Sequence, residues 1–358
     1  MKANKIVNTI IQRISQEEVN TKDLTQAIEF LRSGELVAFP TETVYGLGGD
    51  ALDETASKRI YEAKGRPSDN PLIVHIASVD ALQILAKNVP EDAYKLAKAF
   101  WPGPLTMILK KSDIVPYSTT GGLDTIAIRM PSHPVARRLI EESKVYIAAP
   151  SANVSGRPSP TCADHVIEDM NGRIAMIIDG GSAQIGLEST IVDLVNDKPI
   201  ILRPGYITKQ KLEEVLVQVE YDPAVIAREK SEIRVAKAPG MKYRHYAPKG
   251  ELSIFEGPSD KVVASIRELA TQKLSMNQTV GIIATDETSN EYKEGIVKSI
   301  GSRMDEEAIA AHLFGILREF DSLGVSYIYS ESFDDNSLSQ AIMNRLLKAA
   351  GYQVIRCD

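Results

Sequence analysis

The sequence predicts an α/β protein of two domains, in which a twisted mixed sheet with helices is followed by a smaller α/β domain. The chain has 358 residues, which is more than one typical hydrophobic core holds. Short β-branched runs alternate with amphipathic helix patterns along it. The alternation stops between residues 209 and 249 and then resumes, so we expect a linker between two folded units.

The first alternation covers residues 22–208, after an N-terminal extension at residues 1–21. DLTQAIEFLRSG is typical of a helix with an Asp cap and a Gly stop, and ETASKRIYEAKG predicts a second helix. The spacing between strands varies, which favours a mixed sheet over a purely parallel one. Seven or eight strands are expected, at ELVAFP, LIVHI, LTMIL, TIAIRM, VYIAA, AMIID, TIVDL and IILRP.

Residues 209–249 predict a closing segment and an interdomain linker. KQKLEEVLVQVEYD indicates a helix and a strand that close the first domain, and the cationic stretch after it has little apolar periodicity. Residues 250–358 then predict a compact α/β domain of ordinary size. Its strands are expected at LSIFEG, TVGIIATD, GIVKSIG, SYIYS and QVIRC, and its helices at SDKVVASIRELATQK, MDEEAIAAHLFGILREFDSLG and LSQAIMNRLLKAAG.

The bulk composition indicates a cytoplasmic protein with no membrane span. No apolar run reaches the roughly 18 residues of a transmembrane helix, and the N-terminus lacks the apolar core of a secretion signal. Cys162 and Cys357 have no metal or redox spacing, so we expect reduced thiols. The net charge of −7 argues against a surface that wraps nucleic acid.

Five segments combine an apolar run with a loop rich in Pro, Gly, Ser, Thr and Asn. Such sheet edges build pockets for anionic small molecules, because backbone N–H groups, hydroxyls and guanidinium groups converge there. They therefore predict an enzyme, although GxxxxGK[ST] is absent and GLGG is not GxGxxG. The segments are FPTETVYGLG, KGRPSDNPLIVHI, IAIRMPSHP, PSANVSGRPSPT and ESTIVDL with ILRPG.

Four cations are candidate anion ligands. Lys64 and Arg66 stand at a predicted, exposed helix end, where they would grip a polyphosphate or simply complement the helix dipole. Arg129, at an apolar strand end, must be paired or face a ligand. Arg203 repeats that arrangement, which favours one shared anion site.

Ser151 and Asn153 end a strand and are either turn residues or part of a site. A serine nucleophile is the alternative, but there is no GxSxG elbow and no recognisable general base. His133 and His165 are expected at exposed helix ends and His312 on a helix face. The histidine spacing predicts no metal site.

Taken together, PTETVYGLG, KGRPSDNPLIVH, WPGPLT, IRMPSHP, PSANVSGRPSPT, GLESTIVD and ILRPG resemble the threonylcarbamoyl-AMP synthase family, whose YrdC-like domain would cover residues 22–208. PGMKYRHYAP and AIMNRLLKAA resemble the long form of the family, which adds a linker and a Rossmann-like C-terminal domain. The resemblance implies synthesis of L-threonylcarbamoyl-adenylate from L-threonine, bicarbonate or CO2, and ATP. Pyrophosphate is released, and Mg²⁺ is held mainly by the triphosphate.

The resemblance also assigns residues and partners. The product would pass to a downstream tRNA threonylcarbamoyl-transferase complex, which forms N6-threonylcarbamoyladenosine at position 37 of tRNAs that read ANN codons. No protein metal ligand is implied, and residues 236–248 are expected to act as a lid. The resemblance implies a catalytic tetrad of Lys64, Arg66, Ser151 and Asn153; ATP contacts by Arg66, Asn70, Thr125, Ser151, Ser159, Arg203 and Tyr246; and L-threonine contacts by Thr43, His75, Arg129, Ala149 and Ser189.

Two alternatives stay open at this point. A cationic concave face on this fold could hold double-stranded RNA without catalysis, or add a weak RNA contact to an enzyme, although the acidic total weakens this hypothesis. A carbamoyl-adenylate enzyme of the hydrogenase-maturation type shares the domain. That type carries zinc-finger-like cysteine pairs, which two cysteines cannot supply.

Overall fold

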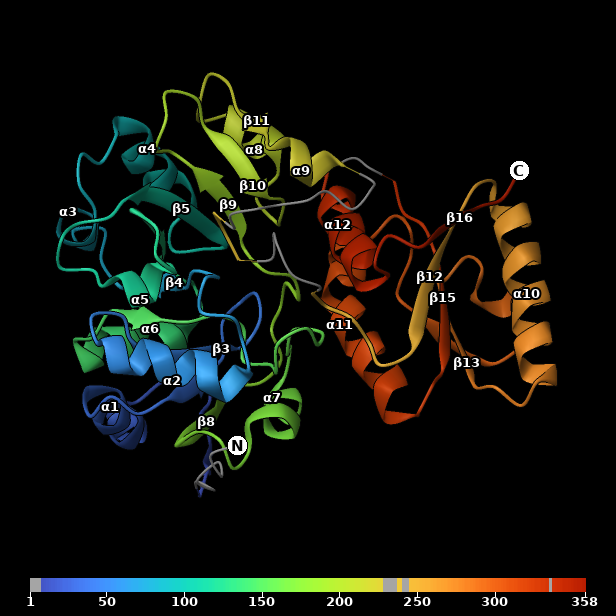
Figure 1. Cartoon of the computed structure of the whole chain (residues 1–358), viewed down its shortest axis with the longest axis horizontal. Coiled ribbons are helices and arrows are strands. Elements are labelled where there is room, and N and C mark those ends of the chain that lie inside the picture. Colours follow the sequence, from blue (N-terminus) through green and yellow to red (C-terminus); the bar gives the residue numbers. More distant parts are fainter. Residues whose placement is uncertain (1–7, 228–236, 240–244, 335–336) are drawn as a thin grey trace.

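A computed structural model describes residues 8–227, 237–239, 245–334 and 337–358 of the chain. They form two α/β domains that lie side by side (Figure 1). The two-domain α/β fold predicted from the sequence is therefore confirmed. The described residues contain no helix that is both long and apolar enough to cross a membrane.

The N-terminal domain holds an eleven-stranded sheet in the order β1-β8-β2-β3-β7-β4-β6-β5-β9-β10-β11. The sheet is mixed, because β5 pairs antiparallel with β6 and parallel with β9. Its strands are β1 (Ile10–Arg13), β2 (Val37–Phe39), β3 (Gly46–Asp50), β4 (Ile73–His75), β5 (Leu105–Lys110), β6 (Thr125–Arg129), β7 (Ile147–Ala148), β8 (Met176–Asp179), β9 (Thr190–Asp193), β10 (Ile200–Arg203) and β11 (Glu220–Tyr221).

Helices cover both faces of this sheet. α1 and α6 pack on one face through a core that includes Phe39 and Ile178, whereas α2, α3, α4 and α7 pack on the other through a core that includes Ala38 and Ile177. Neighbouring residues of β2 and β8 thus face opposite sides, as strand geometry requires. The helices are α1 (Thr25–Arg32), α2 (Glu54–Lys64), α3 (Ala81–Leu85), α4 (Glu91–Phe100), α5 (Tyr117–Thr120), α6 (Pro134–Ser143), α7 (Ala163–Met170), α8 (Lys209–Glu213) and α9 (Pro223–Ile226).

The expected number of strands was too low. β1 lies in the segment expected to be an extension, and it pairs with β8 at the sheet edge. β3 is glycine-rich, so its sequence does not look like a strand. The glycines serve packing: a Cβ on Gly48 would lie 2.7 Å from Cγ2 of Ile147 on the neighbouring strand.

The expected Asp cap of the first helix is also wrong. The chain enters this helix through a 3₁₀ turn, Thr21–Leu24, so Asp23 lies inside the turn and Asn20 precedes it. α1 then begins at Thr25 without a side-chain cap. His133, expected to be exposed, is buried because it caps α6, where its Nδ1 accepts a hydrogen bond from the Val135 amide.

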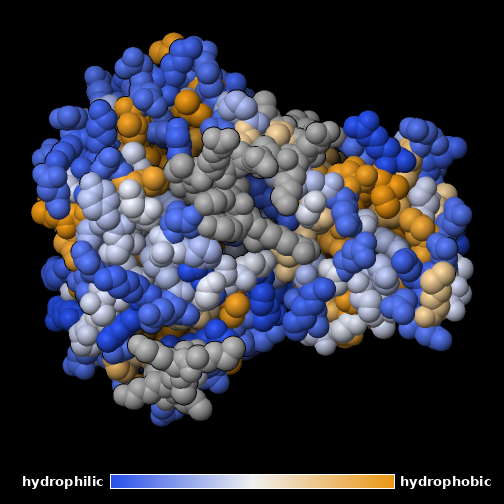
Figure 2. Space-filling model, viewed as in Figure 1, coloured by the Kyte–Doolittle hydropathy of each residue, from blue (hydrophilic) through white to orange (hydrophobic). Residues whose placement is uncertain are grey.

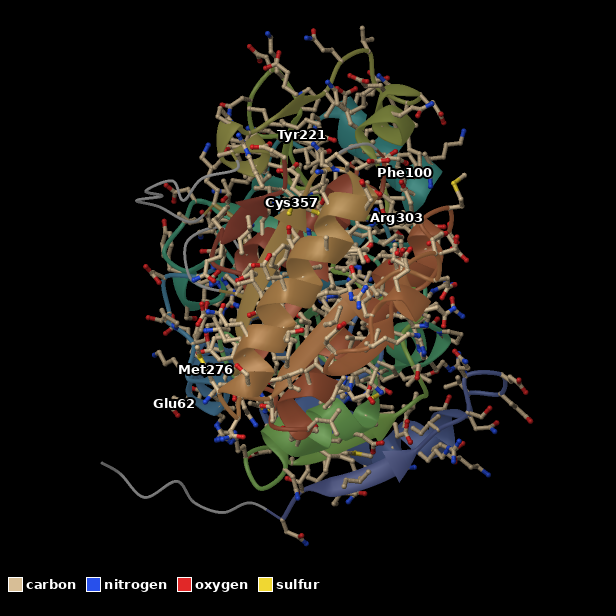
Figure 3. All side chains as sticks on the ribbon, turned by 90° about the vertical axis from the view of Figure 1, so that its right-hand side faces the viewer. Glu62, Phe100, Tyr221, Met276, Arg303 and Cys357 are labelled. Atoms are coloured by element: carbon tan, nitrogen blue, oxygen red, sulfur yellow. The ribbon has the colours of Figure 1, made fainter. Side chains whose placement is uncertain are left out.

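The C-terminal domain is a Rossmann-like parallel sheet in the order β14-β13-β15-β12-β16. α10 covers its outer face and stands in front of the strands in Figure 3. α11 and α12 cover the face toward the N-terminal domain (Figure 1). The elements are β12 (Glu251–Glu256), α10 (Ser259–Ser275), β13 (Val280–Ala284), a 3₁₀ turn (Ser289–Glu291), β14 (Ile296–Ser299), α11 (Glu306–Ser322), β15 (Tyr327–Glu331), α12 (Ser339–Ala349) and β16 (Val354–Arg356).

The two domains share a hydrophobic cluster. Val44 and Leu187, from loops of the N-terminal domain, belong to the same buried cluster as Phe314 of α11 and Ile342 of α12. The face shown in Figure 2 is mainly hydrophilic, with a hydrophobic patch on the C-terminal domain and smaller ones on the N-terminal domain. The C-terminal domain is therefore packed directly onto loops that follow N-terminal strands.

Candidate active site

A cavity lies where β2, β6, β7 and β10 end and β9 begins. The polar residues of the five motifs lie at these strand ends or in the loops next to them, so the topology brings separate segments to one place. Nine of the fourteen site residues expected from the sequence line the cavity. They are Thr43, Arg66, His75, Arg129, Ala149, Ser151, Ser189, Arg203 and Tyr246.

Lys64 is not exposed as expected from its place at a helix end. It is 1% exposed, because the turn that follows β7 covers the end of α2. Its Nζ donates hydrogen bonds to the carbonyl oxygens of Ser151 and Asn153. Burial, and then the charge of Arg66, lower the pKa of Lys64 well below its ordinary value. Lys64 therefore holds the turn at Ser151 and Asn153 in place through its carbonyl oxygens.

The same turn is closed by its own side chains. The Ser151 Oγ donates to Oδ1 of Asn153, and the Asn153 Nδ2 donates to the carbonyl oxygens of Val154 (2.8 Å) and Arg157 (3.0 Å). Among the described residues, the Ser151 hydroxyl thus has an amide oxygen as its hydrogen-bond partner, and neither a histidine nor a carboxylate. This geometry gives no support to a serine nucleophile, but it presents the Ser151 hydroxyl to the cavity.

Of the three expected ATP contacts Arg66, Asn70 and Thr125, Arg66 lines the cavity, whereas Asn70 and Thr125 are not among the described residues that line it. The guanidinium of Arg66 donates to the carbonyl oxygens of Pro71 (3.1 Å) and Asn70 (3.3 Å). Asn70 is buried, and its Oδ1 has no hydrogen-bond partner among the described residues. β4 and β6 run parallel, with Ile73 opposite Ala127. Continuing this register two residues toward the N-terminus sets Pro71 beside Thr125.

Arg129 is held at the other side by two residues of the TET motif. Its Nη1 donates to the Thr43 Oγ1 (2.8 Å), and its Nη2 lies 2.8 Å from Oε1 of Glu42. Burial acts to raise the pKa of Glu42, but the Arg129 guanidinium outweighs it, and the pKa lies below its ordinary value. Glu42 was not predicted as a site residue, although a buried strand-end arginine requires such a partner.

His75 stands next to Arg129 on the adjacent strand, since β4 pairs His75 with Arg129. Its Nδ1 lies 3.1 Å from the carbonyl oxygen of Ile73, which can only accept a hydrogen bond. Burial, and then the charge of Arg129, lower the pKa of His75 to about 3. The ring is therefore neutral at pH 7, with Nδ1 protonated and Nε2 available as an acceptor.

Arg203 and Ser189 form the third wall. The Arg203 Nε donates to the carbonyl oxygen of Ser189 (3.0 Å) and Nη2 to its Oγ (3.1 Å). Burial lowers the pKa of Arg203 to about 10, so this arginine is still cationic at neutral pH. A Cβ on Gly205 would lie 2.6 Å from the amide nitrogen of Thr190, so only glycine allows the two strands to meet here.

Three further residues connect the cavity to the C-terminal domain. The Ser159 Oγ donates to Oε1 of Glu188, which lines the cavity. Oε2 of Glu188 accepts a hydrogen bond from Arg345 of α12 at 2.9 Å. Ser159 was predicted from the sequence, but Glu188 and Arg345 were not, because no local pattern relates residues this far apart in the chain.

Tyr246 closes the cavity from the linker. Its ring stacks on Phe314 with a centroid separation of 5.2 Å, and Pro239 and His245 line the cavity beside it. Residues 236 and 240–244, which include Met241 and Tyr243 of the expected lid, lie outside the described residues. Within the described parts, no group of three or more His, Cys, Asp or Glu side chains could hold a metal ion, and both cysteines are free.

Comparison with known proteins decides the family. A family model described as "Telomere recombination" matches residues 29–205, and a second, "Threonylcarbamoyl-AMP synthase, C-terminal domain", matches residues 207–351. A threonylcarbamoyl-AMP synthase of Pyrococcus abyssi is 51% identical over 97% of this chain and 99% of its own length. The chain belongs to the threonylcarbamoyl-AMP synthase family. A family member from Bacillus subtilis is 49% identical over 95% of this chain and 97% of its own length.

The fold of the threonylcarbamoyl-AMP synthase family is likewise shared. The crystal structure of P. abyssi Sua5 complexed with L-threonine matches with a TM-score of 0.92 and 50% identity, over 98% of this chain and all of that chain. The resemblance recognised in the sequence motifs is thereby confirmed. Neither an RNA-binding module without catalysis nor the hydrogenase-maturation type agrees with relatives of this name over nearly the full chain.

Proposed function

We propose that this chain is an L-threonylcarbamoyladenylate synthase, which condenses L-threonine, CO2 from bicarbonate, and ATP into threonylcarbamoyl-AMP and pyrophosphate. The observation that carries the proposal is that three buried arginines, Arg66, Arg129 and Arg203, line one cavity. Arg129 lies beside Thr43 and His75, and we assign these three to one side of the site and Arg66 with Arg203 to the other. Such a site suits two different anions that must meet.

L-Threonine belongs on the side of Arg129. A guanidinium is the natural partner of an amino-acid carboxylate, and Thr43 and Glu42 hold this one in a single orientation. Nε2 of the neutral His75 is suited to accept a hydrogen bond from the threonine hydroxyl. The backbone at Ala149 and the Ser189 hydroxyl complete the proposed threonine site.

ATP belongs on the opposite side. Arg66 and Arg203 supply positive charge, and Ser151 supplies a hydroxyl, where the phosphates would lie. We assign Asn70 and Thr125 to the nucleotide as well, because Oδ1 of Asn70 has no hydrogen-bond partner among the described residues and would accept a hydrogen bond from the ligand. Ser159 and Tyr246 complete the proposed nucleotide contacts. Lys64 and Asn153 belong to the site by holding the Ser151 turn in shape.

The chemistry then requires orientation and charge neutralisation. The threonine amine attacks CO2, loses a proton and becomes a carbamate. One carbamate oxygen attacks the α-phosphorus, the bond to the β-phosphate oxygen breaks, and pyrophosphate leaves. Arginines on both sides hold the two anions in line and offset their repulsion. Tyr246 over the cavity would exclude water, which protects the mixed anhydride from hydrolysis.

Several wider expectations stay predictions. Glu42 and Glu188 are each paired with an arginine, so the residues present suit an Mg²⁺ ion bound through the triphosphate and water, where it would neutralise phosphate charge. We also propose the division of labour predicted from the sequence: catalysis in residues 22–208, closure by residues 209–249 and support by residues 250–358. We propose as well that the protein works in the cytoplasm and that its product passes to a tRNA-modifying complex.

The proposal is tested by pyrophosphate release from ATP in the presence of bicarbonate and one amino acid at a time. L-Threonine should give the highest rate, and removal of bicarbonate should abolish it. Some turnover with serine is expected, because one methyl group discriminates by only about 1–3 kcal/mol. Equal rates with threonine, alanine and no amino acid would exclude the assigned substrate.

A further inference from the structure

We propose that Arg345, on helix α12 of the C-terminal domain, is a positioning residue of the active site, which neutralises Glu188 so that the cavity can accept the triphosphate of ATP. The inference rests on the proposed function for the identity of the nucleotide. The proposed substrate contacts come from the N-terminal domain and the linker. Through Arg345, the C-terminal domain would also take a direct part in the site.

Arg345 makes three hydrogen bonds across the domain boundary, to the two loops that carry Glu188 and Pro204. Its Nε donates to Oε2 of Glu188 (2.9 Å) and its Nη2 to the Glu188 carbonyl oxygen (3.2 Å). Its Nη1 donates to the carbonyl oxygen of Pro204 (2.7 Å). One guanidinium therefore ties together the loop before β9 and the loop after β10. Ser189 in the first loop and Arg203, the last residue of β10, line the cavity.

α12 is fixed well enough to place this guanidinium. Its buried residues Ile342 and Leu346 belong to the cluster that also contains Val44 and Leu187 from the N-terminal loops. Arg345 itself is fully buried. Its guanidinium carbon lies 5.9 Å from the centre of the Tyr246 ring, which in turn stacks on Phe314. The linker, the C-terminal domain and the cavity thus meet at one arginine.

The electrostatic role follows from the place of Glu188. This carboxylate lines the same cavity as Arg66 and Arg203, where the phosphates are proposed to lie. Burial acts to raise the pKa of Glu188, but Arg345 and then Arg203 outweigh it, and the pKa lies below its ordinary value. Without Arg345, the buried carboxylate of Glu188 would be uncompensated. It would attract Arg203 away from the phosphates and repel the incoming nucleotide.

A purely structural role is the competing explanation, and Arg318 of α11 provides a matched control. Arg318 is also buried, and it also crosses the domain boundary, with hydrogen bonds to the carbonyl oxygen of Pro158 (2.7 Å) and to Asp169 (2.7 Å). Asp169 does not line the cavity, and it keeps a second partner in Arg157. Loss of Arg318 should weaken domain packing without placing a free charge beside ATP.

The experiment measures ATP binding by calorimetry, without threonine, and steady-state KM values for ATP and L-threonine. The variants are Arg345→Met, Arg345→Lys, Glu188→Gln, Arg345→Met with Glu188→Gln, and Arg318→Met. Arg345→Met should weaken ATP binding by about 30-fold or more, with a smaller change in the threonine KM. Removing the carboxylate as well should restore ATP binding to near that of Glu188→Gln alone, since the unpaired charge is gone. Arg318→Met should bind ATP as the unchanged protein does.

Two results would overturn the inference: ATP binding unchanged in Arg345→Met, or a double variant that binds no better than the single one. If Arg345→Met does not fold, Arg345→Lys decides. It keeps the charge but not the three contacts, so it should bind ATP within about threefold of the unchanged protein, and loss of binding would show that contacts rather than charge matter. Because binding is measured without turnover, a protein that binds ATP but does not use threonine would refute the proposed function separately.

Discussion

Replacement of Lys64 by methionine should destabilise the protein as well as abolish turnover. The Lys64 side chain is buried, and its Nζ donates hydrogen bonds to the carbonyl oxygens of Ser151 and Asn153. A buried acceptor left without a donor costs about 1–3 kcal/mol. Two of them give a loss of about 2–6 kcal/mol, part of which is offset because methionine needs no desolvation of a charge. This is a large fraction of the roughly 5–15 kcal/mol that stabilises a domain.

Urea unfolding followed by circular dichroism measures the effect, and helix α2 itself supplies the control. Lys58 lies on the same helix in an exposed ion pair with Glu54 at 3.5 Å, so Lys58→Met should change the free energy of unfolding by less than about 0.5 kcal/mol. Equal stability of Lys64→Met and Lys58→Met, with turnover lost only in the first, would refute the structural role and favour direct phosphate binding by Lys64.

Three further predictions concern other parts of the site. Arg129→Met should raise the KM for L-threonine by about 10- to 150-fold, and adding Glu42→Gln should recover stability but not the KM; an unchanged KM would move the carboxylate site elsewhere. The pKa of His75 is lowered from 6.5 to about 3, so the unfolded chain binds a proton first as the pH falls. Stability should therefore decline between pH 6.5 and 3, and less steeply in His75→Gln, as thermal unfolding at several pH values would show. ATP with L-threonine should protect the chain from trypsin at Lys242 and Arg244 if residues 236–248 act as a lid, whereas undiminished cleavage would identify a passive linker.

The sequence was most informative where a site residue ends a strand or follows it within a few residues. The strand patterns predicted that Arg129, Arg203 and Ser151 lie at strand ends. The pairing of these short strands in the sheet then brings the strand ends to one cavity. Local chemistry is visible in such motifs, because the strand, the turn and the functional side chain lie within a few residues of one another.

The contacts that depend on tertiary structure could not be predicted. Lys64 appears exposed in the sequence, and only the packing of the Ser151 turn over α2 buries it. Glu188 and Arg345 are 157 positions apart, so nothing local relates them. β3 was not predicted because glycine has a low propensity for strands. Its glycines are there because they allow close packing against β7, which depends on tertiary structure.

The central claim is that one cavity joins L-threonine, CO2 and ATP, and isotope labelling tests it most directly. The protein would be incubated with ATP, L-threonine and ¹³C-bicarbonate, and the adenylate product identified at once by mass spectrometry. The account predicts threonylcarbamoyl-AMP carrying one ¹³C atom, formed in step with pyrophosphate and absent when any one of the three substrates is left out. Pyrophosphate release with plain threonyl-AMP, or with an adenylate that carries no ¹³C, would contradict it.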